Sequence, residues 1–146
     1  MGLLPIFILA SGINIIANAG TWNIGLSRDQ MSDEITCTAF HKKGANTLQF
    51  DYYRFLIGIP RFSIAEAISL RFDERPALPL SLILRDEART GVYINRINYE
   101  EFLESRRLRF RLVGSSGFSH DGDFELNGQK KALSLMTTKP CPSPPS

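Results

Sequence analysis

Residues 107–113, RLRFRLV, alternate between arginine and large apolar side chains as far as Leu112. Successive side chains of a β-strand point to opposite faces, so this stretch predicts a strand with one apolar and one charged face. The apolar face would carry Leu108, Phe110 and Leu112, and the charged face Arg107, Arg109 and Arg111. Such a strand belongs to an antiparallel sheet that is covered on one side and solvated on the other.

Other short extended stretches recur along the chain, with turn signals about every 8–12 residues. We expect further strands at 21–26, 34–41, 47–52, 54–58, 67–72, 80–85, 91–94 and 123–126. Residues 86–90 are expected to form a turn. Two short helices are predicted, at 98–105 and 128–136, the first with Asn98 as a candidate cap. This pattern is typical of a mainly β, antiparallel sandwich-like domain with one or two short helices.

The first 27 residues carry no charged side chain. Leu3 to Ile16 form an apolar run that closes on Ala17-Asn18-Ala19, the small-x-small ending of a secretory signal peptide. A membrane span needs about 20 apolar residues, and this run is interrupted by polar residues, glycine and proline. We therefore expect a signal peptide at 1–19 that is cleaved after Ala19. The alternatives are an uncleaved membrane anchor and a buried first strand.

Composition places the rest of the chain among ordinary globular domains. The sequence is 43% hydrophobic and 22% charged, and its 17 basic and 15 acidic residues give a net charge of +2. We expect a single β-rich domain at 20–139, followed by an extended proline-rich tail at 140–146. The charge balance gives no support for nucleic acid as a partner, and membrane contact is expected only through the first segment if it stays uncleaved.

The arginine stripe of 107–113 is the one candidate binding feature. Arg107, Arg109 and Arg111 could present guanidinium groups to a phosphate or carboxylate. A solvated face of a half-buried strand is the alternative. No aromatic side chain shares that face, so stacking of single-stranded nucleic acid is not supported.

The chain has two cysteines, Cys37 and Cys141. In an exported protein, two well-separated cysteines favour one disulfide, and two unpaired thiols are the alternative. Closing a loop of about 100 residues would stabilise the fold by at most about 4.7 kcal/mol in the chain-entropy model. Neither cysteine has neighbours of the metal-binding type, so no zinc site is predicted.

Catalytic motifs are missing from the sequence. It contains no G-x-S-x-G elbow, H-E-x-x-H, P-loop or dinucleotide fingerprint. The stretch 119–125 gathers His120 and three carboxylates, but its spacing fits no known calcium loop, and a polar turn is favoured. A small hydrolase that uses His120 with a nearby serine or aspartate is the least favoured alternative. We predict no catalytic residue, metal or cofactor, and no enzymatic activity.

The order of several segments resembles small exported proteobacterial proteins related to invasion-associated locus B. The residues that resemble the N-terminal part of that family are Trp22, Asp29, Met31-Ser32-Asp33 and Cys37. The block at 70–76, LRFDERP, resembles a strand-turn segment of that family. The closing portion comprises Phe102-Leu103, the strand at 107–113, 124–128, Ala132-Leu133 and Cys141. A similar closing pattern that ends in a cysteine occurs in accessory proteins of type VI secretion.

The resemblance implies a β-rich, non-enzymatic protein of the periplasm or cell surface, with no catalytic residues to transfer. We therefore expect an exported protein of a Gram-negative bacterium, acting through contacts with another envelope or host protein. A periplasmic module that binds an anionic ligand through the arginine stripe is the alternative.

Overall fold

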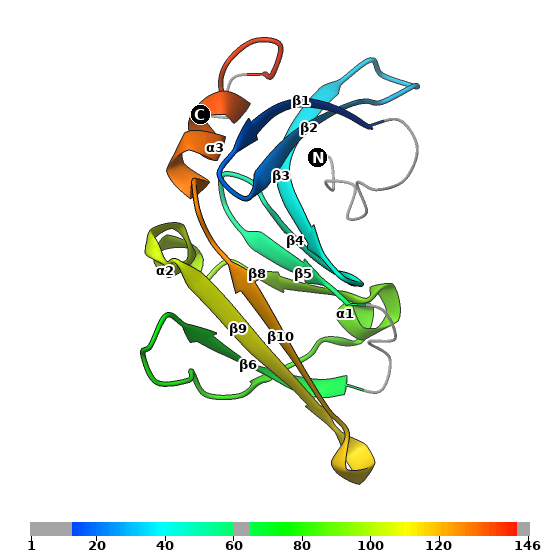
Figure 1. The fold of residues 1–146 in the computed structure, drawn as a ribbon. Coiled ribbons are helices and arrows are strands. Elements are labelled where there is room, and N and C mark those ends of the chain that lie inside the picture. The colour runs from blue at the N-terminus through cyan, green and yellow to red at the C-terminus, as the bar shows by residue number, and fades with distance from the viewer. Residues whose placement is uncertain (1–12, 60–64, 143–146) are drawn as a thin grey trace.

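The computed structural model describes residues 13–59 and 65–142, apart from the side chain of Arg89. Two antiparallel sheets form the fold (Figure 1). The first sheet has the order β1-β2-β3-β4-β5-β8 and the second β10-β9-β6-β7. The strands of the first sheet are β1 (Ile13–Ala19), β2 (Trp22–Arg28), β3 (Ile35–Lys43), β4 (Asn46–Phe50), β5 (Phe55–Gly58) and β8 (Val92–Asn95). Those of the second are β6 (Ala65–Phe72), β7 (Ser81–Leu82), β9 (Arg107–Gly114) and β10 (Ser119–Glu125).

Three short helices complete the fold: α1 (Arg85–Thr90), α2 (Tyr99–Glu104) and α3 (Gln129–Met136). α3 lies beside β1 and β2, while the β9–β10 hairpin reaches away from the first sheet (Figure 1). The expected antiparallel, sandwich-like β fold is confirmed, and the predicted helices at 98–105 and 128–136 agree with α2 and α3 to within a residue.

Aromatic side chains join the two sheets. Phe102 of α2 stacks on Phe55 of the first sheet, with ring centroids 4.6 Å apart, and lies 5.2 Å from Phe50. Phe72 of the second sheet meets Phe55 edge-on at 6.2 Å. Trp22 adds an edge contact to Phe50 at 4.6 Å. Rings in such geometries contribute beyond the area that they bury, so this cluster is the centre of the core.

The strand at 107–113 has the orientation that its pattern predicts. Leu108, Phe110 and Leu112 are 0–3% exposed and face the core. β9 is central in its sheet, with β6 on one side and β10 on the other. Its register with β10 pairs Arg111 directly with Asp121.

Three local predictions were wrong. Residues 86–90 belong to α1 rather than to a turn, because the Glu87 carboxylate accepts the N–H groups of Leu84 (2.9 Å) and Ile94 (2.8 Å) and anchors the segment as a helix. The strand expected at 80–85 is reduced to Ser81–Leu82. β10 runs over Ser119–Glu125, so it contains most of the strand expected at 123–126, but residues 119–122 are also strand rather than part of a polar turn, since arginines of β9 pair with carboxylates of β10.

The end of the predicted signal peptide takes part in the sheet. Residues 13–19 form β1, which pairs antiparallel with β2 at its edge. Residues 1–12 lie outside the described part of the chain, and cleavage after Ala19 stays a prediction. Residues 143–146 of the expected tail also lie outside the described part of the chain. Within the described residues, no helix has the length and apolar character needed to span a bilayer.

Candidate functional site

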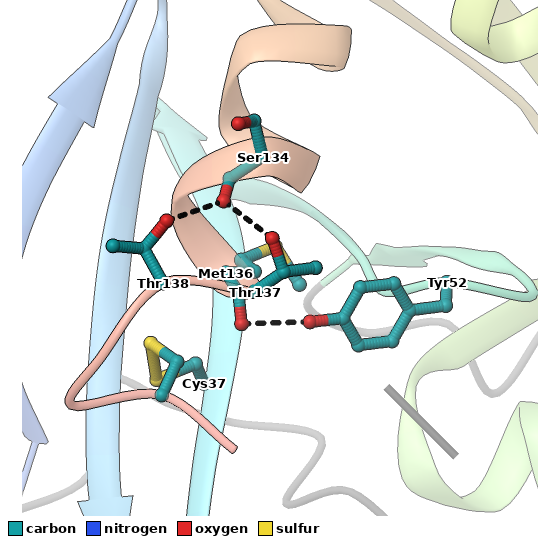
Figure 2. The surroundings of a disulfide bond; sticks show 7 residues. Cys37, Tyr52, Ser134, Met136, Thr137 and Thr138 are labelled. Atoms are coloured by element: carbon teal, nitrogen blue, oxygen red, sulfur yellow. Dashed lines mark hydrogen bonds between the residues drawn. A yellow bond between two sulfur atoms is a disulfide. The ribbon is translucent and has the colours of Figure 1, made fainter. Parts of the chain in front are cut away.

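One covalent link fixes the C-terminal end of the domain. Cys37 of β3 and Cys141 form a disulfide with their Cα atoms 5.7 Å apart, so the pairing that the sequence favoured is confirmed. Figure 2 shows the surroundings: the Tyr52 hydroxyl donates to the carbonyl of Met136 at 2.7 Å, and Thr137 and Thr138 donate to that of Ser134. Burial raises the pKa of Tyr52. The disulfide and the Tyr52 bond hold the end of α3 against the first sheet, and the two threonine bonds close the last turn of the helix.

The arginine stripe lies on the solvent side of β9, and two of its three arginines are already paired with carboxylates of β10. Arg107 contacts Asp123 through two nitrogens, at 2.6 and 3.0 Å, and Arg111 contacts Asp121 at 2.7 and 2.8 Å. Both are bidentate pairs, the geometry in which guanidinium binds carboxylate best. These hydrogen bonds lower the pKa values of Asp121 and Asp123.

Arg109 is engaged differently. Its Nη2 donates to the carbonyl of Asp73 at 2.6 Å and lies 3.6 Å from the Glu74 carboxylate. An anionic ligand on the stripe would therefore compete with oxygens of the chain itself at each arginine. Anion binding by Arg107, Arg109 and Arg111 stays a prediction.

The block at 70–76 has a structural role that sequence reasoning did not assign. The Asp73 carboxylate accepts the backbone N–H groups of Arg106 (2.8 Å) and Arg107 (3.0 Å), which fixes the start of β9. Arg75 reaches α2, 2.7 Å from the Glu101 carboxylate and 2.9 Å from the Ser105 hydroxyl. From the sequence, the block was identified only as a strand followed by a turn, and that pattern does not reveal these distant partners.

An open cavity of about 610 Å³ lies at the start of the stripe. Its lining combines basic and acidic residues with one amide and one apolar residue: Lys43, Arg106, Arg107, Asp123, Glu125, Leu126 and Asn127. The Arg107–Asp123 pair forms part of the wall, so charges of both signs face the cavity. This cavity could not be predicted from the sequence, because its lining comes from three separate segments.

The residues of the least favoured hydrolase alternative are not assembled into a site. His120 lies on the edge strand β10 with its ring 6.1 Å from that of Phe110. The neighbouring Asp121 carboxylate gives both oxygens to Arg111 rather than to an imidazole. Ser115 hydrogen-bonds Glu66. His41 packs edge-on against Trp22, and burial lowers its pKa. The described residues contain no cluster of three potential metal ligands.

A row of exposed leucines follows the edge strand of the second sheet. Leu80, Leu82 and Leu84 occupy alternate positions in and around β7, and they are 60, 82 and 66% exposed. The backbone beneath them is held to β6, since Ile83 N–H donates to the Glu66 carbonyl at 2.9 Å. We call these three side chains the leucine row. Sequence reasoning missed it because apolar residues at alternate positions of a strand ordinarily indicate a buried face.

Comparison with known proteins identifies a shared fold. No family model matches the chain, and no curated protein matches it. The crystal structure of invasion associated protein B from Bartonella henselae matches with a TM-score of 0.62 and 15% sequence identity, over 84% of this chain and 96% of that one. At this identity the likeness establishes the fold alone. It agrees with the first of the two sequence resemblances and does not bear on type VI secretion.

Proposed function

We propose that this chain is an exported, envelope-associated bacterial protein that acts through contact with another protein and performs no catalysis. The fold shared with an invasion-associated protein supports this proposal. So does the Cys37–Cys141 disulfide, because such bonds persist in oxidising compartments such as the periplasm and cell surface.

The leucine row is the observation that carries the proposal. Three large apolar side chains at alternate positions of one extended segment are 60–82% exposed, whereas other strongly exposed apolar residues, such as Met31 and Ile97, lie apart from them in sequence. A contiguous exposed apolar patch marks an interaction surface. Burying one leucine contributes about 1.5–3 kcal/mol, so the row alone could provide several kcal/mol of binding energy.

The position of the row on an edge strand supports an extended segment as the partner. β7 ends its sheet, with β6 as its neighbour and no strand on its other side among the described residues. A sheet edge binds extended segments by adding them as a further strand. We therefore propose that the row receives an extended, apolar-rich segment of an envelope or host-surface protein.

Site-directed photo-crosslinking in the native envelope tests this surface. A photoreactive residue replacing Leu82 is expected to capture a partner protein, whereas the same residue at Ile97 should not capture that partner. Capture of a second copy of this chain, or equal capture at both positions, would contradict the proposal.

Binding of the identified partner is then compared between two variants. Leu80→Gln/Leu82→Gln/Leu84→Gln should weaken binding at least about 30-fold, because the transfer energy of three leucines is lost. Met31→Gln/Ile97→Gln removes two side chains of similar exposure elsewhere and should leave affinity unchanged. Circular dichroism checks that both variants fold. Unchanged affinity in the folded triple variant would refute the leucine row as the docking surface.

A further inference from the structure

The open cavity at the start of the arginine stripe is lined by segments of both sheets. Lys43 comes from the end of β3 in the first sheet, while Arg106 and Arg107 lie at the start of β9 in the second. The end of β10 and the two residues after it, Leu126 and Asn127, complete the lining. Its volume of about 610 Å³ lies in the range of about 300–1,000 Å³ that is usual for small-molecule sites.

The backbone around the cavity is held in place by hydrogen bonds. The Arg106 N–H donates to the Asp73 carboxylate at 2.8 Å, and the Arg106 carbonyl accepts the N–H of Leu126 at 2.8 Å. The carbonyl of Asn127 accepts the N–H of Thr21 at 3.0 Å. A wall that is already ordered loses little freedom when a ligand binds, so the affinity of a ligand here would not be reduced by ordering the chain.

Two of the charged residues in the lining neutralise each other. Arg107 holds Asp123 through two nitrogens, at 2.6 and 3.0 Å. The pKa of Asp123 is lowered first by these hydrogen bonds and further by the charge of Lys43, which therefore lies close to the pair. Three charged side chains remain: Lys43, Arg106 and Glu125. None of them forms a salt bridge with another residue in the described part of the chain. Two cations and one anion leave the cavity with an excess of positive charge.

We propose that this cavity binds a small molecule through an oxyanion group, a phosphate or a carboxylate, which Lys43 and Arg106 hold together. A guanidinium presents a planar fork of donors to two oxygens, and an ammonium adds a compact positive charge. The carboxylate of Glu125 opposes the bound anion and limits its affinity.

The proposed site is distinct from the arginine stripe. The stripe arginines already bind oxygens of the chain, whereas Lys43 and Arg106 keep their side-chain donors for a ligand. The site also shares no residue with the leucine row, so it stands or falls independently of the protein contact proposed above.

An amide NMR titration of the full, oxidised chain tests the site. Inorganic phosphate and acetate are added separately at constant ionic strength. We expect saturable shifts at 43, 106 and 125–127, with a dissociation constant of about millimolar order for two charge-assisted contacts. Saturation by phosphate alone, by acetate alone or by both supports the site and shows which oxyanion it prefers. Saturation by neither would overturn the proposal.

Four variants assign the binding to these side chains. Lys43→Gln and Arg106→Gln should each raise the dissociation constant about tenfold, because each removes one charge-assisted contact. Arg111→Gln removes the same charge from the stripe, outside the cavity, and should leave the constant unchanged. Glu125→Gln should lower it, because the opposing carboxylate is gone.

The variants also separate a site from a general effect of charge. All four side chains are exposed, so the amide spectrum should show an intact fold in each variant. Equal weakening by Arg111→Gln and Arg106→Gln would assign the anion to net charge rather than to the cavity and would overturn the proposal. Weaker binding in Glu125→Gln would overturn it as well, since a carboxylate cannot favour a bound anion beside it.

Discussion

Tyr99 shows how much one polar atom can do in an aromatic core. The residue is 8% exposed, and its hydroxyl donates to the backbone carbonyl of Asp51 at 2.6 Å. This bond joins α2 to the loop between β4 and β5. Burial, reinforced by the charge of Asp51, raises the pKa of Tyr99 above the ordinary value of 10.0.

The raised pKa predicts a loss of stability in alkali. Since the unfolded chain ionises Tyr99 first, the stabilisation is complete below about pH 10 and falls as the pH rises further. Tyr99→Phe should cost about 0.5–1.5 kcal/mol at neutral pH through the lost hydrogen bond, and this deficit should shrink above pH 10. Urea denaturation across pH 7–11 measures it. The exposed Tyr53→Phe is the control, and a deficit independent of pH would contradict the prediction.

The arginine stripe illustrates what a residue pattern leaves open. Alternation in 107–113 was enough to predict which side chains of β9 face the core and which face solvent. It could not predict that Asp121 and Asp123 pair with the stripe, because those partners depend on the hairpin register. A polar stretch such as 119–125 becomes a strand when the neighbouring strand neutralises its carboxylates.

At the level of the element, tertiary contacts decided what local sequence could not. The helices α2 and α3 were predictable because the apolar pattern of each is complete within its own segment. Asn98 does precede α2, but its side chain makes no capping hydrogen bond. α1 was not, since its defining residue acts outside the helix: Glu87 is 7% exposed and accepts the N–H of the residue preceding the helix, Leu84, and that of Ile94 in β8. The leucine row was missed for the reverse reason, because alternation does not reveal whether the apolar face is covered.

Glu87 should therefore control the order of α1 and β8 together. Glu87→Ala leaves two backbone N–H groups without their acceptor, which costs about 1–3 kcal/mol for each buried group. Hydrogen exchange is expected to accelerate at Leu84 and throughout 92–95, while β9 stays protected. Glu100→Ala, an exposed acidic residue of α2, is the matched control. An unchanged exchange rate at Ile94 would show that the Glu87 carboxylate does not hold β8, the edge strand of the first sheet.

Over the whole molecule, the order of elements places the two ends of the domain side by side. β1 begins the first sheet, and α3, the last helix, lies against β1, β2 and β3 (Figure 1). The disulfide closes this arrangement, because it links β3 to Cys141 across 104 residues. The sequence could predict the pair of cysteines, but not that they secure the helix on which β1 rests.

The disulfide should accordingly carry a large part of the stability. Cys37→Ser/Cys141→Ser is expected to lower the free energy of unfolding by about 2–5 kcal/mol, since the unfolded chain regains the freedom of a long loop. Urea midpoints of the variant and of the oxidised wild type measure the difference, and reduced wild type should match the variant. Hydrogen exchange should accelerate first in α3 and β1. A variant as stable as the oxidised protein, or one that loosens the β9–β10 hairpin before α3, would show that the bond does not fasten this end of the fold.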